Sequence, residues 1–382
     1  MKKQLRNLLG VTLLAVMAVT IPSCSSDDDS VDTSINDANE LRGEITESKT
    51  LTSDNVYTLT GELIVKNGAV LTIEAGTRIE ASGISYIAVE QGGKIYVNGT
   101  ATNPVVMTSP TQAPGSWGGL VICGKAPINK GTTAQAEVSG LTYGGTDVND
   151  NSGSIKYLRI EYSGFAYNSE KEFNGLSMFG VGKGTTIEYV QVHEGSDVGF
   201  EWFGGTVDTS HLISTSNEDD QFDWTEGWNG NNENWYSKKG LGRGNRGIEA
   251  DSNANDRSAT PISSPTITNL TLIGLGAADE GSENQAMKLR EGTHGIFDNV
   301  YIKSFARGLD VQHDETIAAV GTTLKLTNVK FDADVTEKAK YTNTDGSAAT
   351  PTGLFTESES AQGAGNNGGV PTWAQGWTIG LE

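Results

Sequence analysis

The stretch Ile155-Lys156-Tyr157-Leu158-Arg159-Ile160 decides the fold, because its pattern returns along the chain. The pattern is an apolar residue, any residue, Tyr or Asn, an apolar residue, any residue and a final apolar residue. It recurs at 187–192, 267–272, 297–302 and 326–331, and three of the four intervals between copies are 32, 30 and 29 residues. A unit this short buries its apolar face only by stacking on other units. The Asn that recurs at one fixed position predicts a stacked Asn ladder.

The segments that precede these copies are also short, apolar and largely alternating. They lie at 61–65, 69–73, 77–80, 86–89 and 94–97. The 48 Gly and 9 Pro, without long helical patterns, favour short strands joined by tight turns. A β-propeller blade would be longer, about 40–50 residues, and a β-sandwich would not repeat in this way. We therefore expect an all-β fold, a right-handed parallel β-helix (a solenoid) with irregular loop insertions.

The amino-terminal segment has the features of a targeting signal. Basic residues at 2, 3 and 6 precede an apolar run at 8–21, and the small residue Ser23 precedes Cys24. This is the pattern of a secretory signal peptide, and the run is shorter than the roughly 20 residues of a transmembrane helix. The cysteine at the cleavage position makes the segment resemble a bacterial lipoprotein signal. The resemblance implies removal of residues 1–23 and attachment of a diacylglycerol and an acyl chain (palmitate) to Cys24.

Residues 24–45 are polar and are expected to form a flexible acidic tether. The acidic run at 25–30 resembles the export tag of surface lipoproteins in Bacteroidota, and a solvated charged linker is the alternative. The body, residues 46–382, would then be held on the outer membrane, facing outward or into the periplasm. We expect it to be a single domain in which Trp373 and Trp377 cap the open end.

Charge and cysteine content limit the partners. The formal net charge is −21, which disfavours nucleic acid, and no nucleotide-binding motif is present. Divalent cations, basic proteins and neutral glycans remain possible. If lipid occupies Cys24, Cys123 has no partner in the chain, and we expect a fold without disulfides in which Cys123 is a small buried residue.

A second repeat places charged residues between apolar ones. The triads are Phe200-Glu201-Trp202, Phe222-Asp223-Trp224, Ile248-Glu249-Ala250, Met287-Lys288-Leu289 and Leu309-Asp310-Val311. The first two and the last two are each 22 residues apart. We expect each triad to form one strand, with apolar residues inside and the charge outside.

Stacking at about 4.8 Å would align Glu201, Asp223 and Glu249 in a carboxylate ladder. Like charges this close repel, so the ladder must recruit a cation, stay partly protonated or splay into solvent. With Asp219 and Asp220 it offers oxygens to a structural Ca²⁺. A solvated acidic face and a catalytic group are the alternatives.

The catalytic alternative is a polysaccharide lyase or a glycoside hydrolase acting on an acidic polysaccharide. Asp219, Asp220 and Asp223 could supply an acid and a base, and Lys288 or Arg290 could serve as the base of a lyase. The His-Gly turn and the basic strand expected of polygalacturonases have only approximate matches in this chain, and these matches occur in the reversed order.

Aromatic residues give a third possibility. Trp228, Trp235 and Tyr236 lie outside the inward phase of the triads and are the expected ligand contacts, because exposed rings stack on sugars and anchor interfaces. Trp202 and Trp224 share the inward phase and are expected in the core.

The chain resembles a family of β-helical bacterial surface lipoproteins of unsettled function. The resemblance rests on the segments at 115–129, 201–207 and 219–223. Relatives are sometimes described as transporters, which one removable apolar segment does not support. We therefore expect a binding or scaffold protein, leaning away from an enzyme, with a glycan or another envelope protein as its partner.

Overall fold

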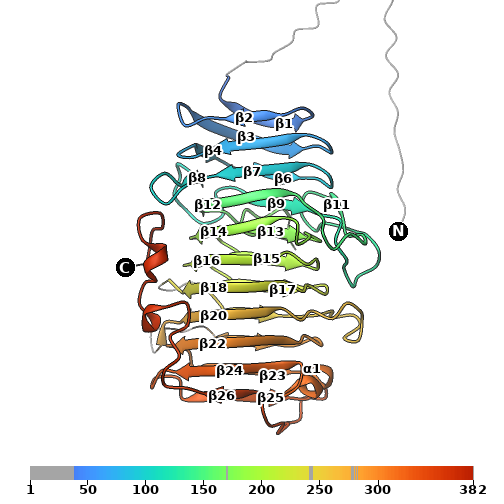
Figure 1. The fold of residues 1–382 in the computed structure, drawn as a ribbon, viewed down its shortest axis with the longest axis vertical. Helices are drawn as coiled ribbons and strands as arrows, with labels where there is room; N and C mark the ends of the chain where they lie inside the picture. Colours follow the sequence, from blue (N-terminus) through green and yellow to red (C-terminus); the bar gives the residue numbers. More distant parts are fainter. Residues whose placement is uncertain are drawn as a thin grey trace, which may run out of the picture. The chain divides into compact units, whose positions relative to one another are not determined.

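The body of the chain is a right-handed parallel β-helix, as the sequence predicts (Figure 1). The computed structural model describes residues 38–168, 171–240, 244–276, 279, 281 and 283–381. Cys24 and most of the predicted tether lie outside these residues. Residues 40–45, predicted to belong to the tether, form β1, and Leu41 and Ile45 are buried in the core.

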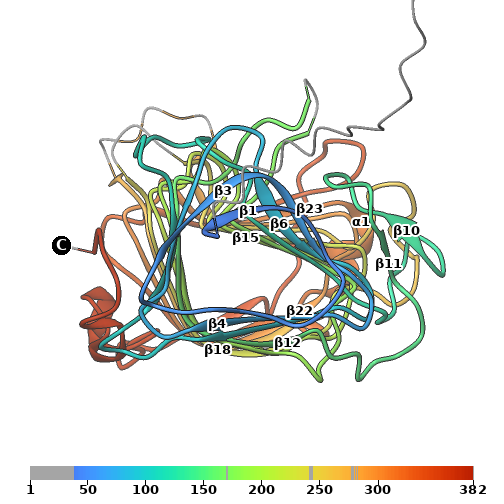
Figure 2. The ribbon, with the colours of Figure 1, turned by 90° about the horizontal axis from the view of Figure 1, so that it is seen from above.

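Three strand segments make up each of the first coils, and all but the ten-residue strand at Val56–Val65 are short. They are β1 (Glu40–Ile45), β2 (Lys49–Leu51), β3 (Val56–Val65), β4 (Val70–Glu74), β5 (Arg78–Ala81), β6 (Tyr86–Val89), β7 (Lys94–Asn98), β8 (Val105–Thr108) and β9 (Leu120–Cys123). From β12 onward two of the three strands merge, because the long strand β12 pairs with both β7 and β8. Figure 2 shows the resulting coils stacked around a common interior.

The later coils alternate long and short strands. The long-strand stack consists of β12 (Gly153–Glu161), β14 (Thr186–His193), β16 (Thr209–Thr215), β18 (Asn231–Lys238), β20 (Thr266–Ile273), β22 (Gly295–Lys303), β24 (Leu324–Phe331) and β26 (Phe355–Glu357). The short-strand stack continues β6 and β9 through β13 (Leu176–Phe179), β15 (Phe200–Phe203), β17 (Phe222–Thr225), β19 (Ile248–Ala250), β21 (Gln285–Leu289), β23 (Arg307–Gln312) and β25 (Glu337–Thr342). The remaining elements lie in excursions: the hairpin β10 (Ala134–Gln135) and β11 (Thr142–Tyr143), helix α1 (Asp314–Ala319) and 3-10 turns at Asn366–Gly368 and Thr372–Ala374.

The third position of the hexad bends each long strand. The residues there all have a left-handed backbone: Tyr157, Tyr189, His211, Asn234, Asn269, Asn299 and Asn328, with φ between 50° and 61°. Asn is among the residues that best tolerate this conformation, and the bend lets one strand serve two faces of the coil. The recurring Tyr or Asn is therefore a backbone requirement as well as a stacking position.

The predicted Asn ladder is present, and a stack of aromatic rings, which the sequence interpretation did not include, precedes it at the same position. Tyr157 stacks on Tyr189 with ring centroids 4.4 Å apart, and Tyr189 stacks on His211 at 4.2 Å. Further along, Asn269 Nδ2 donates to Asn234 Oδ1 at 3.0 Å, and the amide of the next asparagine, at 299, donates to Asn269 at 2.7 Å. The ladder changes from ring stacking to amide hydrogen bonding without leaving the same corner of the coil.

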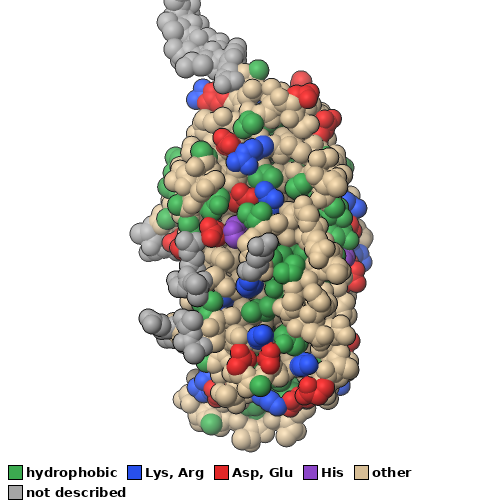
Figure 3. All heavy atoms as spheres, turned by 90° about the vertical axis from the view of Figure 1, so that its left-hand side faces the viewer, with side chains coloured by type: hydrophobic (Ala, Val, Ile, Leu, Met, Phe, Trp, Pro, Cys, Tyr) green, Lys and Arg blue, Asp and Glu red, His purple; other side chains and the backbone are tan. Residues whose placement is uncertain are grey.

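The carboxy-terminal segment does not cap an end of the helix, so this prediction is wrong. Residues 361–381 run along the outside of the coils, over the corner ladder (Figures 1 and 2). Trp377 meets Tyr157 and Tyr189 edge-on, and Trp373 meets His211 edge-on. The two tryptophan rings pack there because this contact removes the apolar surface of the stacked aromatic side chains from water. Figure 3 views this side and shows hydrophobic and charged side chains interspersed over it.

Cys123 is buried, and burial raises the pKa of its thiol, as expected of a structural cysteine. Within the described part of the chain, no helix is long and apolar enough to cross a membrane.

Candidate functional site

The five charged triads lie in register on one face. Glu201 pairs with Asp223 and Asp223 with Glu249 in the short-strand stack. Lys288 and then Asp310 continue the same column. The apolar neighbours of each charge point into the core, so the sequence predicts both the register and the orientation of this column correctly.

Three basic side chains surround the carboxylate of Glu249. Its carboxylate lies 2.9 Å from Nη1 of Arg246, 3.0 Å from Nε of Arg290 and 3.6 Å from Nζ of Lys288. Arg246 also bonds Asp220, with 2.9 Å between Nη1 and Oδ2. Burial alone would lower the pKa of Arg246, but Asp220 and Glu249 outweigh it and raise that pKa. The cluster thus supplies its own fixed counter-ions at the Glu249 end.

Asp223, in the middle of the ladder, has no such compensation. Within the described part of the chain it has no hydrogen-bond or ion-pair partner. Burial, and then the charges of Glu201 and Glu249, raise its pKa well above the ordinary value. Burial raises the pKa of Glu201 as well, helped by Glu137 and opposed by Asn174, whose Nδ2 donates to Glu201 at 2.5 Å. Both shifts favour the protonated form of these two carboxyl groups over the ionised form.

A second group of acids lies in the turns that precede these strands. Burial and the neighbouring Asp219 raise the pKa of Asp197 to about 8. Burial also raises the pKa of Asp219, while a hydrogen bond from the Asn245 amide lowers it. Burial raises the pKa of Asp251 to about 6, against the attraction of Arg290. The site is a set of acids at different stages of protonation.

The fit to calcium is incomplete. Asp220, Asp223 and Glu249 each offer an oxygen, and these oxygens lie within 4.8 Å of one another. However, Nη1 of Arg246 already bonds two of the three carboxylates, and Ca²⁺ requires six to eight oxygens. Glu201 lies one strand beyond the group, and Asp219 bonds Asn245. Calcium binding by these residues stays a prediction.

The predicted ligand contacts Trp228, Trp235 and Tyr236 are wrong, because all three side chains are buried. Trp228 and Trp235 stack on Trp202 inside the coil, at centroid distances of 4.6 and 4.9 Å. Trp235 occupies the inward fourth position of a hexad whose first and last positions are Asn232 and Ser237, so the pattern is hidden in the sequence. Tyr236 faces outward, but the carboxy-terminal segment covers it. Trp202 and Trp224 are in the core as predicted.

The sequence interpretation missed Arg246. It precedes Glu249 by three residues, and Arg307 precedes Asp310 by three and forms the same kind of ion pair, at 2.8 Å. Both segments read Arg, Gly, an apolar residue and an acid. This repeat was a detectable signal for a basic partner at each acid.

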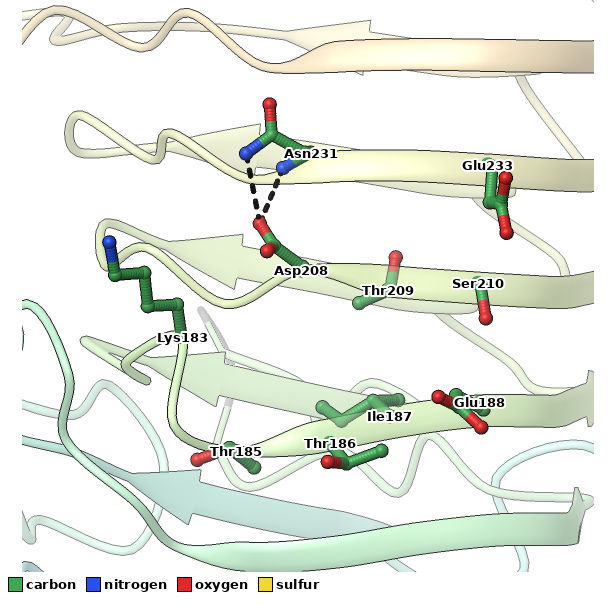
Figure 4. A pocket seen from close by; sticks show the side chains of 10 residues that line it. All are labelled: Lys183, Thr185, Thr186, Ile187, Glu188, Asp208, Thr209, Ser210, Asn231 and Glu233. Atoms are coloured by element: carbon green, nitrogen blue, oxygen red, sulfur yellow. Dashed lines mark hydrogen bonds between the residues drawn. The ribbon is translucent and has the colours of Figure 1, made fainter.

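A shallow hollow on the long-strand stack is less favourable as a site. It has a volume of about 300 Å³ and lies across β14, β16 and β18 (Figure 4). Asp208 there accepts hydrogen bonds from the backbone and side-chain nitrogens of Asn231, at 2.7 and 3.4 Å. Glu188 pairs with Lys156 at 3.1 Å. Because Asp208 and Glu188 already have polar partners, we place the candidate site on the carboxylate ladder.

Comparison with known proteins agrees with this architecture. Residues 43–378 match the model of the pectate-lyase like beta helix domain. No curated protein sequence matches the chain. The enzymatically active domain of bacteriophage CBA120 tailspike protein 2 shares 14% identity and a TM-score of 0.27, over 80% of this chain and 42% of that one. The A-module of Azotobacter vinelandii mannuronan C-5 epimerase AlgE4 shares 13% identity and a TM-score of 0.24, over 82% and 83%. The chain thus spans less than half of the tailspike domain, and likenesses this distant carry no argument about activity.

Proposed function

Because the chain belongs to the pectate-lyase-like β-helix family, we propose that it binds a glycan on the outer face of the short-strand stack. Cys24 would carry the lipid that anchors the body to the outer membrane, with the body facing outward. The chain would hold the glycan without cleaving it, as a surface-bound binding protein.

The free carboxyl group of Asp223 is the observation that carries this proposal. It lies between Glu201 and Glu249, one strand spacing of about 4.8 Å from each. In its protonated form, which the raised pKa favours, this carboxyl group both donates and accepts a hydrogen bond. The ion-paired Lys288 and Arg290 place further donors alongside. Sugar hydroxyls also donate and accept, so a row of such groups on a rigid strand face suits a polyol chain.

Binding without cleavage follows from the protonation of the same groups. Asp251 and Glu249 outweigh burial and raise the pKa of Arg290, which keeps it charged and unable to act as a base. The charge of Glu249 is balanced by its ion pairs, and the raised pKa values of Glu201 and Asp223 favour their protonated forms. Hydrolysis needs an ionised base or nucleophile beside an acid, and the Glu249 carboxylate is already engaged by its three basic partners.

A glycoside hydrolase is the second candidate. A carboxyl group kept protonated near neutral pH is what a general acid requires, and Asp223 has this property. The strand spacing of about 4.8 Å is close to the separation of about 5–5.5 Å between the carboxyl groups of retaining enzymes.

Binding and cleavage are tested with the mature protein on a panel of neutral and acidic polysaccharides. We expect retardation in affinity electrophoresis with at least one polysaccharide, and no reducing ends or unsaturated products. Asp223→Ala should weaken binding about tenfold, as for loss of a strong hydrogen bond. The control Glu188→Ala removes an acid from the other stack and should leave binding unchanged. Product release would favour the hydrolase or lyase, and equal binding by both variants would refute the site.

Calcium and the anchor need separate measurements. If the acids bind Ca²⁺, about 1 mM, the range of extracellular sites, should raise the temperature of unfolding relative to a chelator. No shift would reject the metal. Cys24→Ser should move the protein out of the membrane fraction. Protease added to intact cells should digest the body, and full protection would place it in the periplasm.

A further inference from the structure

An aromatic pocket lies on the same face as the carboxylate ladder, at the first coils. It has a volume of about 460 Å³, within the range of small-molecule sites. Tyr86 and Phe173 form a buried floor, with ring centroids 4.8 Å apart. Tyr167, whose side chain is 47% exposed, meets Phe173 edge-on at 5.6 Å and stands at the rim beside Ile84, which is 70% exposed. This hollow offers both apolar surface and an exposed ring.

The backbone holds Tyr167 in place. The amide of Phe173 donates to the carbonyl of Phe165 at 3.1 Å, and Ala166 forms an antiparallel bridge with Glu172. The amide of Phe165 donates in turn to the carbonyl of Trp117 in the neighbouring coil, at 2.9 Å. The ring is therefore carried by a loop whose two ends are joined to each other and to the body.

The polar groups of the pocket favour an uncharged, hydroxyl-bearing ligand. Glu62 accepts a hydrogen bond from the Tyr86 hydroxyl at 2.8 Å and keeps a second oxygen for another donor. The hydroxyl of Ser139 has no hydrogen-bond partner within the described part of the chain. The lining includes an acid and no described Lys or Arg, so a carboxylate-bearing sugar would be repelled. A pyranose with an apolar face and neutral hydroxyls matches both sets of groups.

Two segments connect this pocket to the ladder. Phe173 forms its floor, and the next residue, Asn174, bonds Glu201. Ser139 lines the pocket, and Glu137, two residues earlier, contributes to the raised pKa of Glu201. Tyr86 is three strand steps from Glu201 along the stack, about 14 Å. A single glycan chain of a few residues can therefore occupy both places.

We propose that this pocket binds a neutral hexose residue of the glycan, with the ring of Tyr167 against one face of the sugar. The inference rests on the proposed function and narrows its ligand class to glycans that carry uncharged hexoses. Glu62 would accept a hydrogen bond from one hydroxyl of the sugar, and Ser139 would donate a hydrogen bond to another.

The test uses the mature protein and saturation-transfer NMR with hexasaccharides of glucose, mannose, galactose, galacturonate and glucosamine. We expect at least one neutral hexasaccharide to bind. Tyr167→Ala should weaken its binding about five- to tenfold, as for loss of an aromatic contact, and Tyr167→Phe should stay within about twofold because the ring remains. Tyr96→Ala removes a half-buried tyrosine from β7, elsewhere on the body, and should change nothing.

The outcomes separate the two proposals. Binding of a neutral hexasaccharide that weakens in Asp223→Ala but not in Tyr167→Ala would overturn the pocket and leave the proposed function standing. Binding of only the galacturonate or glucosamine hexasaccharide would overturn the choice of a neutral hexose. Binding of none would overturn the pocket, while the polysaccharide panel would still decide the proposed function.

Discussion

Replacing Asp197 by Asn should make the body more stable at alkaline pH. Asp197 lies in the turn before β15, where burial, and then the charges of Asp219 and Glu172, raise its pKa from 3.8 to about 8. The protonated carboxyl group bonds Asp219. Asparagine has nearly the same shape and keeps a donor for that bond, but it has no proton to lose.

The sign follows from proton binding. Between pH 3.8 and about 8 the folded chain keeps the Asp197 proton while the unfolded chain has lost it. The free energy of unfolding therefore falls as pH rises through this window, by about 1.4 kcal/mol per pH unit. Over four units this is about 5–6 kcal/mol. The side chain keeps some contact with water, so we expect about half, roughly 3 kcal/mol, which corresponds to about 6 °C.

The assay is thermal unfolding of both proteins from pH 4.5 to pH 8. We expect equal midpoints at pH 4.5 and a midpoint about 6 °C higher for Asp197→Asn at pH 8. Asp54→Asn, at an exposed turn, is the control and should follow the wild type throughout. Parallel curves for the wild type and Asp197→Asn would show that the group is ionised in the folded chain, and would refute the account of the site as a set of protonated acids.

Three further substitutions test the fold and the packing of the carboxy-terminal segment against the coils. Glu249→Gln leaves its basic neighbours without their carboxylate and should cost about 2 kcal/mol, because the ion-pair cluster is partly buried. The unfolding midpoint should then fall by about 4 °C. The control Glu188→Gln lies at the surface and should have little effect. Asn269→Ala removes two ladder hydrogen bonds at a left-handed position and should cost about 2 kcal/mol in chemical denaturation, about twice the cost of Asn269→Gly. Gln191→Ala removes the two-way hydrogen bonding to the backbone of Ile379, and the last 20 or so residues should then be cut faster in limited proteolysis while the coils stay resistant. Unchanged cleavage would mean that packing alone holds the segment.

Much of the coil could be predicted because a stacked strand repeats its inward and outward positions. The hexads align as predicted, Ile155 with Ile187 and Ile267 with Phe297. The triads align as well. A solenoid converts a spacing in the sequence into a contact between neighbours, so the register of the carboxylate ladder could be predicted from the sequence.

The excursions could not be predicted in this way, because no period constrains them. The segment that covers Tyr236 comes from the distant carboxy terminus, and the burial of Tyr236 has no local signal. Arg246 lies in a turn, and only its position three residues before Glu249 marks it. The pocket around Tyr167 is built from a loop between strands, where composition says little about which side chains meet.

The placement of like charges in the outer column argues that the site is functional. From β6 onward the residues of this column are Ala88, Val121, Ser177, Glu201, Asp223, Glu249, Lys288, Asp310 and Lys340. The first three are neutral and the last three alternate in sign, so in neither group do two like charges lie next to each other. Only the middle three are like-charged neighbours, and there the cost is met by protonation and by ion pairs from outside the column. Since the coil folds with neutral or alternating residues elsewhere, its architecture does not require three acids in succession, which supports the proposal that this face binds a ligand.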